Sequence, residues 1–152
     1  MINICLLGAT GSIGTQTLDI IRNDKNYCLA AFSFGENIRK AEEIINEFSP
    51  KLVSCKTKEL KEELKLKYPS INFVYGENGL NEVATYNEES KEYIVINALV
   101  GSIGLLPTEK AIRMNRNILL ANKETLVIGG EIIMKLASEY ISIHSNCFFC
   151  RK

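Results

Sequence analysis

The chain has 152 residues, 46% hydrophobic and 24% charged, with 18 basic and 18 acidic residues and a formal net charge of zero. This size predicts one globular domain with a substantial core. The balanced charge argues against a nucleic-acid partner, which would favour a basic face. No apolar run reaches membrane-spanning length, and the N-terminus lacks a signal-peptide pattern. The odd number of cysteines, five, favours a reducing cytoplasm.

Short apolar runs alternate with segments of helical periodicity along the chain. The runs that predict strands are Ile2–Leu7, Cys28–Phe34, Leu52–Cys55, Ile71–Val74, Tyr93–Leu99 and Ile118–Leu120. The segments that predict helices are Thr15–Arg22, Ile38–Phe48, Lys58–Lys67, Leu80–Tyr86, Leu106–Asn115 and Thr125–Tyr140. Strands that are apolar almost throughout are typical of a parallel sheet covered on both faces. We therefore predict an α/β fold, a doubly wound, mostly parallel sheet of the Rossmann type with helices on both faces.

The first strand runs directly into a glycine-rich turn, Gly8-Ala9-Thr10-Gly11-Ser12-Ile13-Gly14, which opens a helix. In such a turn Gly8 lets the chain leave the strand sharply, and Gly14 lets the helix pack closely. Gly11 leaves space where a pyrophosphate would approach the backbone. The free amides of the first helical turn carry partial positive charge and attract an anion. The pattern predicts a dinucleotide-binding site.

The second predicted strand ends in Ser33-Phe34-Gly35-Glu36-Asn37. NAD-binding domains place an acidic residue near the end of this strand, where it hydrogen-bonds the ribose 2′-hydroxyl. Ser33 stands at about that place and leaves room for a 2′-phosphate, so the segment favours NADPH over NADH. Glu36 works against this preference, because its carboxylate repels a phosphate. Asn37 is equally consistent with a ligand contact and with a simple helix N-cap.

Two later strands also end in segments suited to ligand binding. Asn97–Thr108 passes from a strand into a glycine-rich loop, and Ile118–Val127 passes from a strand into Asn122-Lys123-Glu124. In open α/β sheets ligands bind at the carboxyl ends of the strands. The glycine-rich loop is therefore expected to border the nicotinamide half of the cofactor. Asn122-Lys123-Glu124 is expected to bind a ligand, or to form a solvated turn in which Asn122 caps the helix.

Taken together, four stretches resemble the 1-deoxy-D-xylulose 5-phosphate reductoisomerase family, NADPH-dependent enzymes of the non-mevalonate isoprenoid pathway. They are Gly8–Gly14, Gly35–Asn37, Ala98–Gly101 with Gly104–Thr108, and Leu119–Val127. The last stretch is highly specific to the family, and the resemblance extends from Met1 to about Tyr140.

The resemblance implies a role for each matching residue. It implies that the pyrophosphate is contacted by Thr10, Gly11, Ser12 and Ile13, and that the adenosine 2′-phosphate is bordered by Gly35, Glu36 and Asn37. It implies further cofactor contacts from Asn122 and Glu124. Lys123 is implied to contact the substrate, 1-deoxy-D-xylulose 5-phosphate. The family often has a basic residue at the position of Glu36. This departure weakens the expected grip on the 2′-phosphate, for which backbone amides and Arg39 would compensate.

The family's reaction, which yields 2-C-methyl-D-erythritol 4-phosphate, also needs Mg²⁺ or Mn²⁺ held by acidic ligands that follow the cofactor domain. No acidic residue follows Glu139. We therefore expect an NADPH-binding domain over residues 1–140 and a divergent tail over 141–152, with no catalytic residue, no metal ligand and no catalytic domain in this chain. The family is dimeric, and an apolar surface is expected where its second domain docks. Turnover by these residues alone is expected to be negligible, and a non-catalytic nucleotide-binding fragment is the alternative function.

Other interpretations explain less of the sequence. His144, Cys147 and Cys150 provide only three of the four ligands that a closed zinc site needs. Asn146-Cys147 is similar to the nucleophile segment of semialdehyde dehydrogenases, but that family leaves Asn122-Lys123-Glu124 unexplained. No tyrosine has a lysine four positions later, as short-chain dehydrogenases require.

Overall fold

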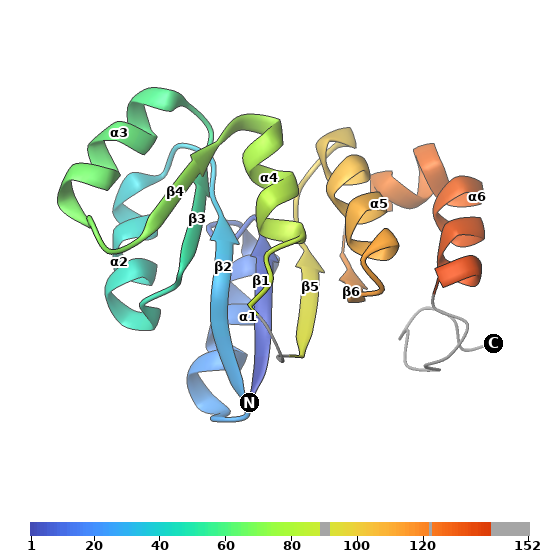
Figure 1. Ribbon diagram of the computed structural model, residues 1–152, viewed down its shortest axis with the longest axis horizontal. Helices are drawn as coiled ribbons and strands as arrows, with labels where there is room; N and C mark the ends of the chain where they lie inside the picture. Colours follow the sequence, from blue (N-terminus) through green and yellow to red (C-terminus); the bar gives the residue numbers. More distant parts are fainter. Residues whose placement is uncertain (89–91, 122, 141–152) are drawn as a thin grey trace.

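The computed structural model describes residues 1–88, 92–121 and 123–140, so the predicted tail over 141–152 lies outside the described residues. The described strands are β1 (Ile2–Leu7), β2 (Tyr27–Ser33), β3 (Leu52–Cys55), β4 (Asn72–Tyr75), β5 (Tyr93–Asn97) and β6 (Asn117–Leu120). The helices are α1 (Ser12–Asn23), α2 (Ile38–Phe48), α3 (Lys58–Lys67), α4 (Gly76–Ala84), the 3-10 helix η1 (Ser102–Gly104), α5 (Leu105–Arg113) and α6 (Lys123–Tyr140) (Figure 1).

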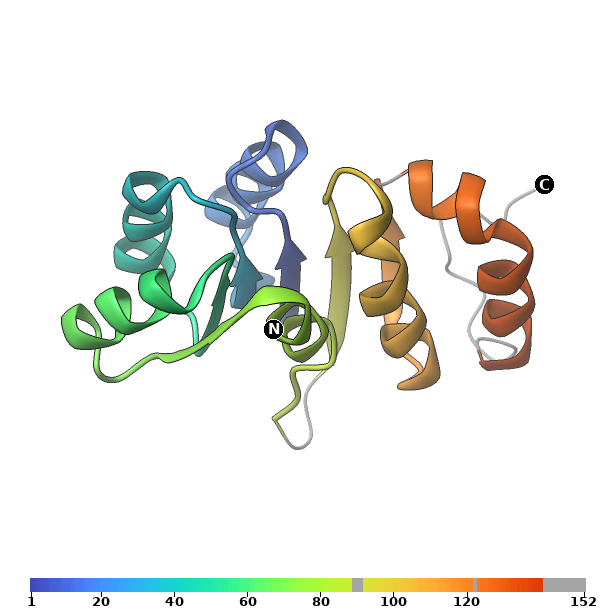
Figure 2. The same cartoon turned by 90° about the horizontal axis from the view of Figure 1, so that it is seen from above.

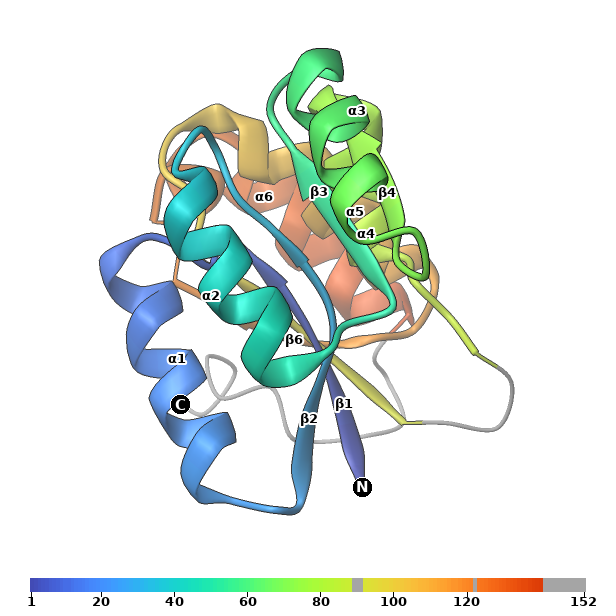
Figure 3. The same ribbon diagram turned by 90° about the vertical axis from the view of Figure 1, so that its left-hand side faces the viewer.

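The six strands form one sheet in the order β4-β3-β2-β1-β5-β6, and all five neighbouring pairs are parallel. From β1 the chain proceeds outward to β4 at one edge and then returns through β5 to β6 at the other. Because parallel crossovers are right-handed, this reversal puts helices on both faces of the sheet. Figure 2 and Figure 3 show α1 and α2 on one side of the strands and α4 and α5 on the other. The predicted doubly wound fold is confirmed.

The core has one layer on each face of the sheet, and β1 contributes to both. Ile4 and Leu6 pack with buried side chains of α1, α2 and α3, whereas Cys5 and Leu7 pack with those of α4 and α5. The alternation follows from the period of two along a strand. Both faces of β1 are buried, which explains why its sequence is apolar nearly throughout.

Several element boundaries differ from the sequence prediction. Helix α1 begins at Ser12 rather than Thr15, and α6 begins at Lys123 rather than Thr125. Strand β5 ends at Asn97 rather than Leu99. The largest shift is in α4, which spans Gly76–Ala84 instead of the predicted Leu80–Tyr86. Hydrophobic periodicity misses the polar first turn of a helix, so it places the helix start too late.

Helix α1 lies against the turn that precedes it because two glycines lack side chains. Gly8 has a φ of +84°, and a Cβ there would lie 2.8 Å from the Ala98 carbonyl oxygen. A Cβ on Gly14 would lie 2.3 Å from the Gly8 carbonyl oxygen and 2.6 Å from that of Ala9. The neighbouring atoms are backbone and cannot move aside as a flexible side chain would. The two glycines therefore fix where the first helical turn sits above the sheet.

Replacing Gly14 by alanine is expected to lower the free energy of unfolding by about 2–3 kcal/mol, because the added methyl overlaps backbone oxygen atoms. Urea unfolding followed by circular dichroism measures this loss. Gly130→Ala is the matched control, since its Cβ would meet no atom within 4 Å and alanine favours a helix by about 0.5–1 kcal/mol. Equal effects of the two substitutions would contradict the packing argument.

Candidate functional site at the carboxyl ends of the strands

Strand β1 lies between β2 and β5, and the direction in which the chain adds strands to the sheet reverses there. The glycine turn follows β1 directly. Gly11 is the N-cap of α1, with no side-chain cap, and its own amide donates to the Gly8 carbonyl oxygen at 3.2 Å. By helix geometry the amides of Ser12, Ile13 and Gly14 lack an acceptor within the helix. They form a patch of partial positive charge at the reversal point, where open α/β sheets bind ligands.

Ser33, at the end of β2, holds this turn in place. Its hydroxyl accepts a hydrogen bond from the Gly8 amide at 3.0 Å, and its carbonyl oxygen accepts one from the Ala9 amide at 2.8 Å. The residue is only 1% exposed. Ser33 is thus a structural support of the glycine turn. In the sequence, the only sign of this role is a hydroxyl residue within an apolar strand. That the small Ser33 side chain also leaves room for a 2′-phosphate stays a prediction.

The segment Gly35-Glu36-Asn37 is exposed and follows β2 at the same edge of the sheet. The Asn37 side-chain oxygen accepts from the Lys40 amide at 3.2 Å, so Asn37 is the N-cap of α2. A Cβ on Gly35 would meet no atom within 4 Å, which leaves open space above its backbone. The Lys56 ammonium lies 2.6 Å from a carboxylate oxygen of Glu36 and holds the pKa of that carboxyl below its usual range.

Asn97 organises the loop that follows β5, and the sequence analysis missed this role. The side chain is fully buried, and its amide nitrogen donates to the Gly104 carbonyl oxygen at 3.0 Å and to the Thr108 hydroxyl at 2.8 Å. Its side-chain oxygen accepts from the Leu99 amide at 3.1 Å. One buried amide thus joins the strand, the loop and α5. A polar residue that ends an apolar strand before a glycine is the signal that could have found it.

The end of β6 reaches the same edge of the sheet. The Ala121 amide donates to the Asn97 carbonyl oxygen at 2.9 Å, which fixes the strand end beside the β5 loop. Glu124 lies in the first turn of α6 and is partly buried. Lys123 is the first residue of α6. The predicted cofactor contact Asn122 lies outside the described residues.

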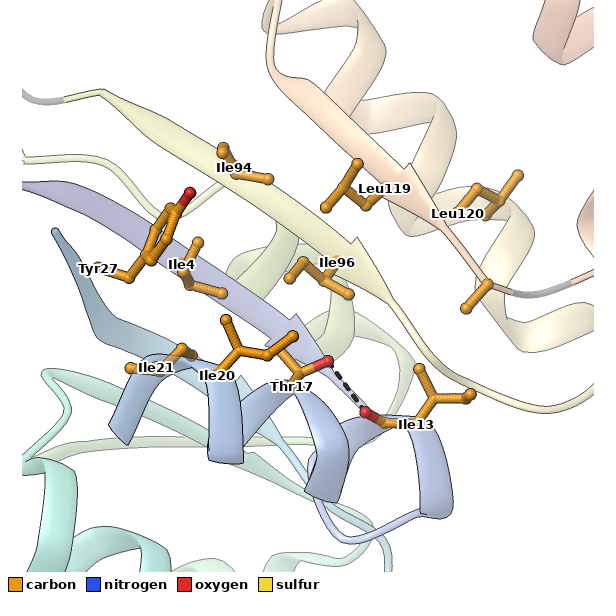
Figure 4. A pocket seen from close by; sticks show the side chains of 11 residues that line it. Ile4, Ile13, Thr17, Ile20, Ile21, Tyr27, Ile94, Ile96, Leu119 and Leu120 are labelled. Atoms are coloured by element: carbon orange, nitrogen blue, oxygen red, sulfur yellow. Dashed lines mark hydrogen bonds between the residues drawn. The ribbon is translucent and has the colours of Figure 1, made fainter. Parts of the chain in front are cut away.

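An apolar groove joins the glycine turn to the end of β6. It encloses about 410 Å³ over β1, β5 and β6, beside α1, and both Ile13 and Ala121 line it. Figure 4 shows Ile13 at the start of α1 and Leu119 on β6 facing the same space. Ile20 on α1 is 61% exposed and Leu119 is 37% exposed. The groove arises from the topology, because the crossover helices on this face lie over the β1–β4 half of the sheet.

The three cysteines among the described residues, Cys5, Cys28 and Cys55, differ in burial. Cys5 and Cys55 are buried free thiols, and burial raises the pKa of Cys5 to about 12 and also raises that of Cys55. Cys28 is only half-buried, and its thiol donates to the Asn3 side-chain oxygen at 3.0 Å. Cys5 and Cys55 are thus unreactive side chains of the core. Within residues 1–88, 92–121 and 123–140, no three potential metal ligands cluster.

A glycine turn at the start of a helix, set at the reversal point of a parallel doubly wound sheet, is typical of dinucleotide-binding domains of the Rossmann type. The family model for 1-deoxy-D-xylulose 5-phosphate reductoisomerase matches residues 4–130. The chain therefore belongs to the 1-deoxy-D-xylulose 5-phosphate reductoisomerase family.

Relatives named 1-deoxy-D-xylulose 5-phosphate reductoisomerase are similar to most of this chain. The protein of Listeria innocua is 49% identical over 140 residues, which cover 91% of this chain and 36% of the relative. That of Bacillus cereus strain AH187 is 48% identical over 160 residues, which cover 99% of this chain and 41% of the relative. The chain thus spans about two-fifths or less of the length of these relatives.

Solved structures of the family share the fold. The crystal structure of DOX-P reductoisomerase with NADPH, fosmidomycin and magnesium matches with a TM-score of 0.83 at 33% identity, over 92% of this chain and 35% of that one. The Zymomonas mobilis enzyme in complex with NADPH matches with a TM-score of 0.81 at 29% identity, over 91% and 36%. Among the described residues, no helix is both long and apolar enough to cross a membrane.

Asn97→Leu is expected to lower the free energy of unfolding by about 3 kcal/mol, because the buried partners of the amide lose their hydrogen bonds. Chemical denaturation measures the change. Asn23→Ala is the control: this asparagine is exposed and bonds only within its own helix, so a change within about 0.5 kcal/mol is expected. A loss for Asn97→Leu no larger than for the control would remove the proposed role of Asn97.

Proposed function

We propose that this chain is the NADPH-binding part of a 1-deoxy-D-xylulose 5-phosphate reductoisomerase. The observation that carries the proposal is the cradle at the start of α1. A Cβ on Gly11 would meet only the Gly8 carbonyl oxygen, at 3.4 Å, so the space beyond Gly11 is open. The amides of Ser12, Ile13 and Gly14 have no acceptor within the helix. An anion of pyrophosphate size satisfies these donors without displacing protein atoms.

The proposed contacts follow the order of loops along the sheet edge. Thr10, Gly11, Ser12 and Ile13 hold the pyrophosphate, and Gly35, Glu36 and Asn37 border the adenosine 2′-phosphate. Asn122 and Glu124 contact the cofactor, and Lys123 contacts the sugar-phosphate substrate. The groove that Ile13 and Ala121 share supports this path, because it connects the turn to the β6 end. NADPH supplies a hydride when bound, and the residues named here orient its reactive ring.

The conversion of 1-deoxy-D-xylulose 5-phosphate to 2-C-methyl-D-erythritol 4-phosphate is proposed for the longer protein of the family. The matched region spans only 35–41% of the relatives compared above. We assign cofactor binding to residues 1–140 and place the Mg²⁺- or Mn²⁺-dependent step in sequence outside this region, where the metal acts as a Lewis acid on the substrate. Homodimer formation and a cytoplasmic location complete the proposal, and the free thiols of Cys5 and Cys55 support the location.

The apolar groove is proposed to receive the additional sequence that the longer relatives contain. Its walls combine Ile13 and Ile20 of α1 with Ile94 and Ile96 of β5 and Leu119 of β6. An apolar surface of this kind is costly to leave in water. One end of the groove lies beside the proposed cofactor contacts. A segment that covers the groove would therefore also shield the nicotinamide from water.

Gly11→Val is expected to abolish NADPH binding, because the branched side chain fills the open space above the turn. Fluorescence titration of the purified chain with NADPH measures the affinity, and thermal unfolding checks that the fold survives, as the 3.4 Å spacing predicts. Gly130→Val, on α6 and away from the turn, is the control. Unchanged NADPH affinity in Gly11→Val would contradict the cradle.

The double substitution Ile20→Gln with Leu119→Gln is expected to reduce binding of an apolar dye such as 1-anilinonaphthalene-8-sulfonate to this chain several-fold, because it makes the groove polar. Dye fluorescence at fixed protein concentration measures the effect. Leu66→Gln is the matched control, since Leu66 is 87% exposed on α3 and does not line the groove. If the control lowers the signal as much as the double substitution, the groove is not the apolar surface that binds.

A further inference from the structure

The loop after β2 presents a carboxylate where a dinucleotide with a 2′-phosphate needs a cation. The Glu36 side chain is 69% exposed, and the open space above Gly35 adjoins it. A phosphate placed there meets a like charge, which disfavours NADPH relative to NADH. An NADPH-specific site at this loop therefore requires a cation that is held close to the carboxylate. This inference rests on the proposed binding of NADPH.

Lys56 meets that requirement, although it lies on a different loop. Strands β2 and β3 pair in register, with Ser33 opposite Ser54, so they end side by side at the carboxyl edge of the sheet. Just beyond these ends, the Lys56 amide donates to the Gly35 carbonyl oxygen at 3.4 Å. The Lys56 ammonium then reaches a carboxylate oxygen of Glu36 at 2.6 Å. The backbone and the side chain of Lys56 are thus both anchored to the Gly35-Glu36 segment.

The ion pair is suited to an exchange of partners. Its two side chains are 63% and 69% exposed, and exposed pairs of this kind contribute little to stability. A phosphate monoester carries nearly two negative charges and three acceptor oxygens near neutral pH, so it attracts the ammonium more strongly than one carboxylate does. Lysine has a flexible stem and three donors, so Lys56 can bind a phosphate without movement of β3.

We propose that Lys56 is the cation that binds the adenosine 2′-phosphate, and that Glu36 weakens this contact by competing for the same ammonium. Arg39 and Lys40 stand in the first turn of α2 and add positive charge nearby. Lys56 differs from them in being fixed against Gly35 and Glu36 by two hydrogen bonds. Selectivity for NADPH over NADH in this chain then depends on the loop after β3 as well as on the loop after β2.

The test compares NADPH and NADH affinities of the wild-type chain with those of Lys56→Met, Lys56→Arg and Glu36→Gln. Lys56→Met is expected to weaken NADPH binding about tenfold, the usual size for loss of a charge-assisted hydrogen bond, and to leave NADH binding unchanged. Lys56→Arg is expected to retain the preference, and Glu36→Gln to tighten NADPH binding several-fold. Lys67→Met is the matched control, because Lys67 also pairs with a glutamate, Glu42, but on helices α3 and α2.

Each outcome has one meaning. Unchanged NADPH affinity in Lys56→Met, an equal loss in Lys67→Met, or no gain in Glu36→Gln would overturn the assignment, and thermal unfolding of each variant checks that its fold is intact. Equal losses for NADPH and NADH in Lys56→Met would also overturn it, because a 2′-phosphate contact cannot affect NADH. A wild-type chain that binds neither nucleotide would instead contradict the proposed function itself.

Discussion

The close approach of α1 to the end of β1 is the constraint on which the rest of the site depends. Two glycines make it possible, since a side chain at Gly8 or Gly14 would overlap backbone carbonyl groups. The Ser33 hydroxyl then holds the turn from below by accepting the Gly8 amide. With the helix fixed in this way, its first amides point out of the sheet edge and cannot be satisfied by the helix itself. The proposed anion binding rests on this geometry.

The sheet brings the other loops to one edge, and hydrogen bonds between neighbouring loops hold them there. Because all neighbouring strands are parallel, β1, β2, β3, β5 and β6 deliver their following loops to one edge. The Asn97 network and the bond from the Ala121 amide to the Asn97 carbonyl oxygen join the ends of β5 and β6 to the loop after β5. On the β2–β3 side the loops are joined by Lys56 through Gly35 and Glu36. A dinucleotide that spans both sides would lie between the hydrogen-bonded β5–β6 side and the Lys56–Glu36 ion pair on the β2–β3 side.

The fold class could be predicted from the sequence because it rests on local patterns. The apolar run Ile2–Leu7, the glycines after it and the periodicity of Thr15–Arg22 each report on a few neighbouring residues. The position of β5 beside β1 is not local; it belongs to the doubly wound strand order that Rossmann-type domains share. Helix starts were predicted late because polar first turns, such as that of α4, carry no apolar periodicity.

The site was only partly predictable. Gly8, Gly11 and Gly14 form a recognisable spacing, but Ser33 and Asn97 interrupt apolar strands with a single polar residue each. Their roles depend on partners 25 residues away for Ser33 and 7 and 11 residues away for Asn97. The Lys56–Glu36 pair likewise joins residues 20 apart through the β2–β3 register. Periodicity and motif spacing do not contain these contacts, because they arise only when the sheet is assembled.

The amide resonances of the isotopically labelled chain, recorded with and without NADPH, test the central claim most directly. If the amides at the start of α1 hold the pyrophosphate, those of Ser12, Ile13 and Gly14 shift most strongly, together with Gly35 and Glu36 in the loop after β2. Saturating NADPH that leaves these five amides unchanged, or that shifts only residues at the opposite edge of the sheet, would contradict the account.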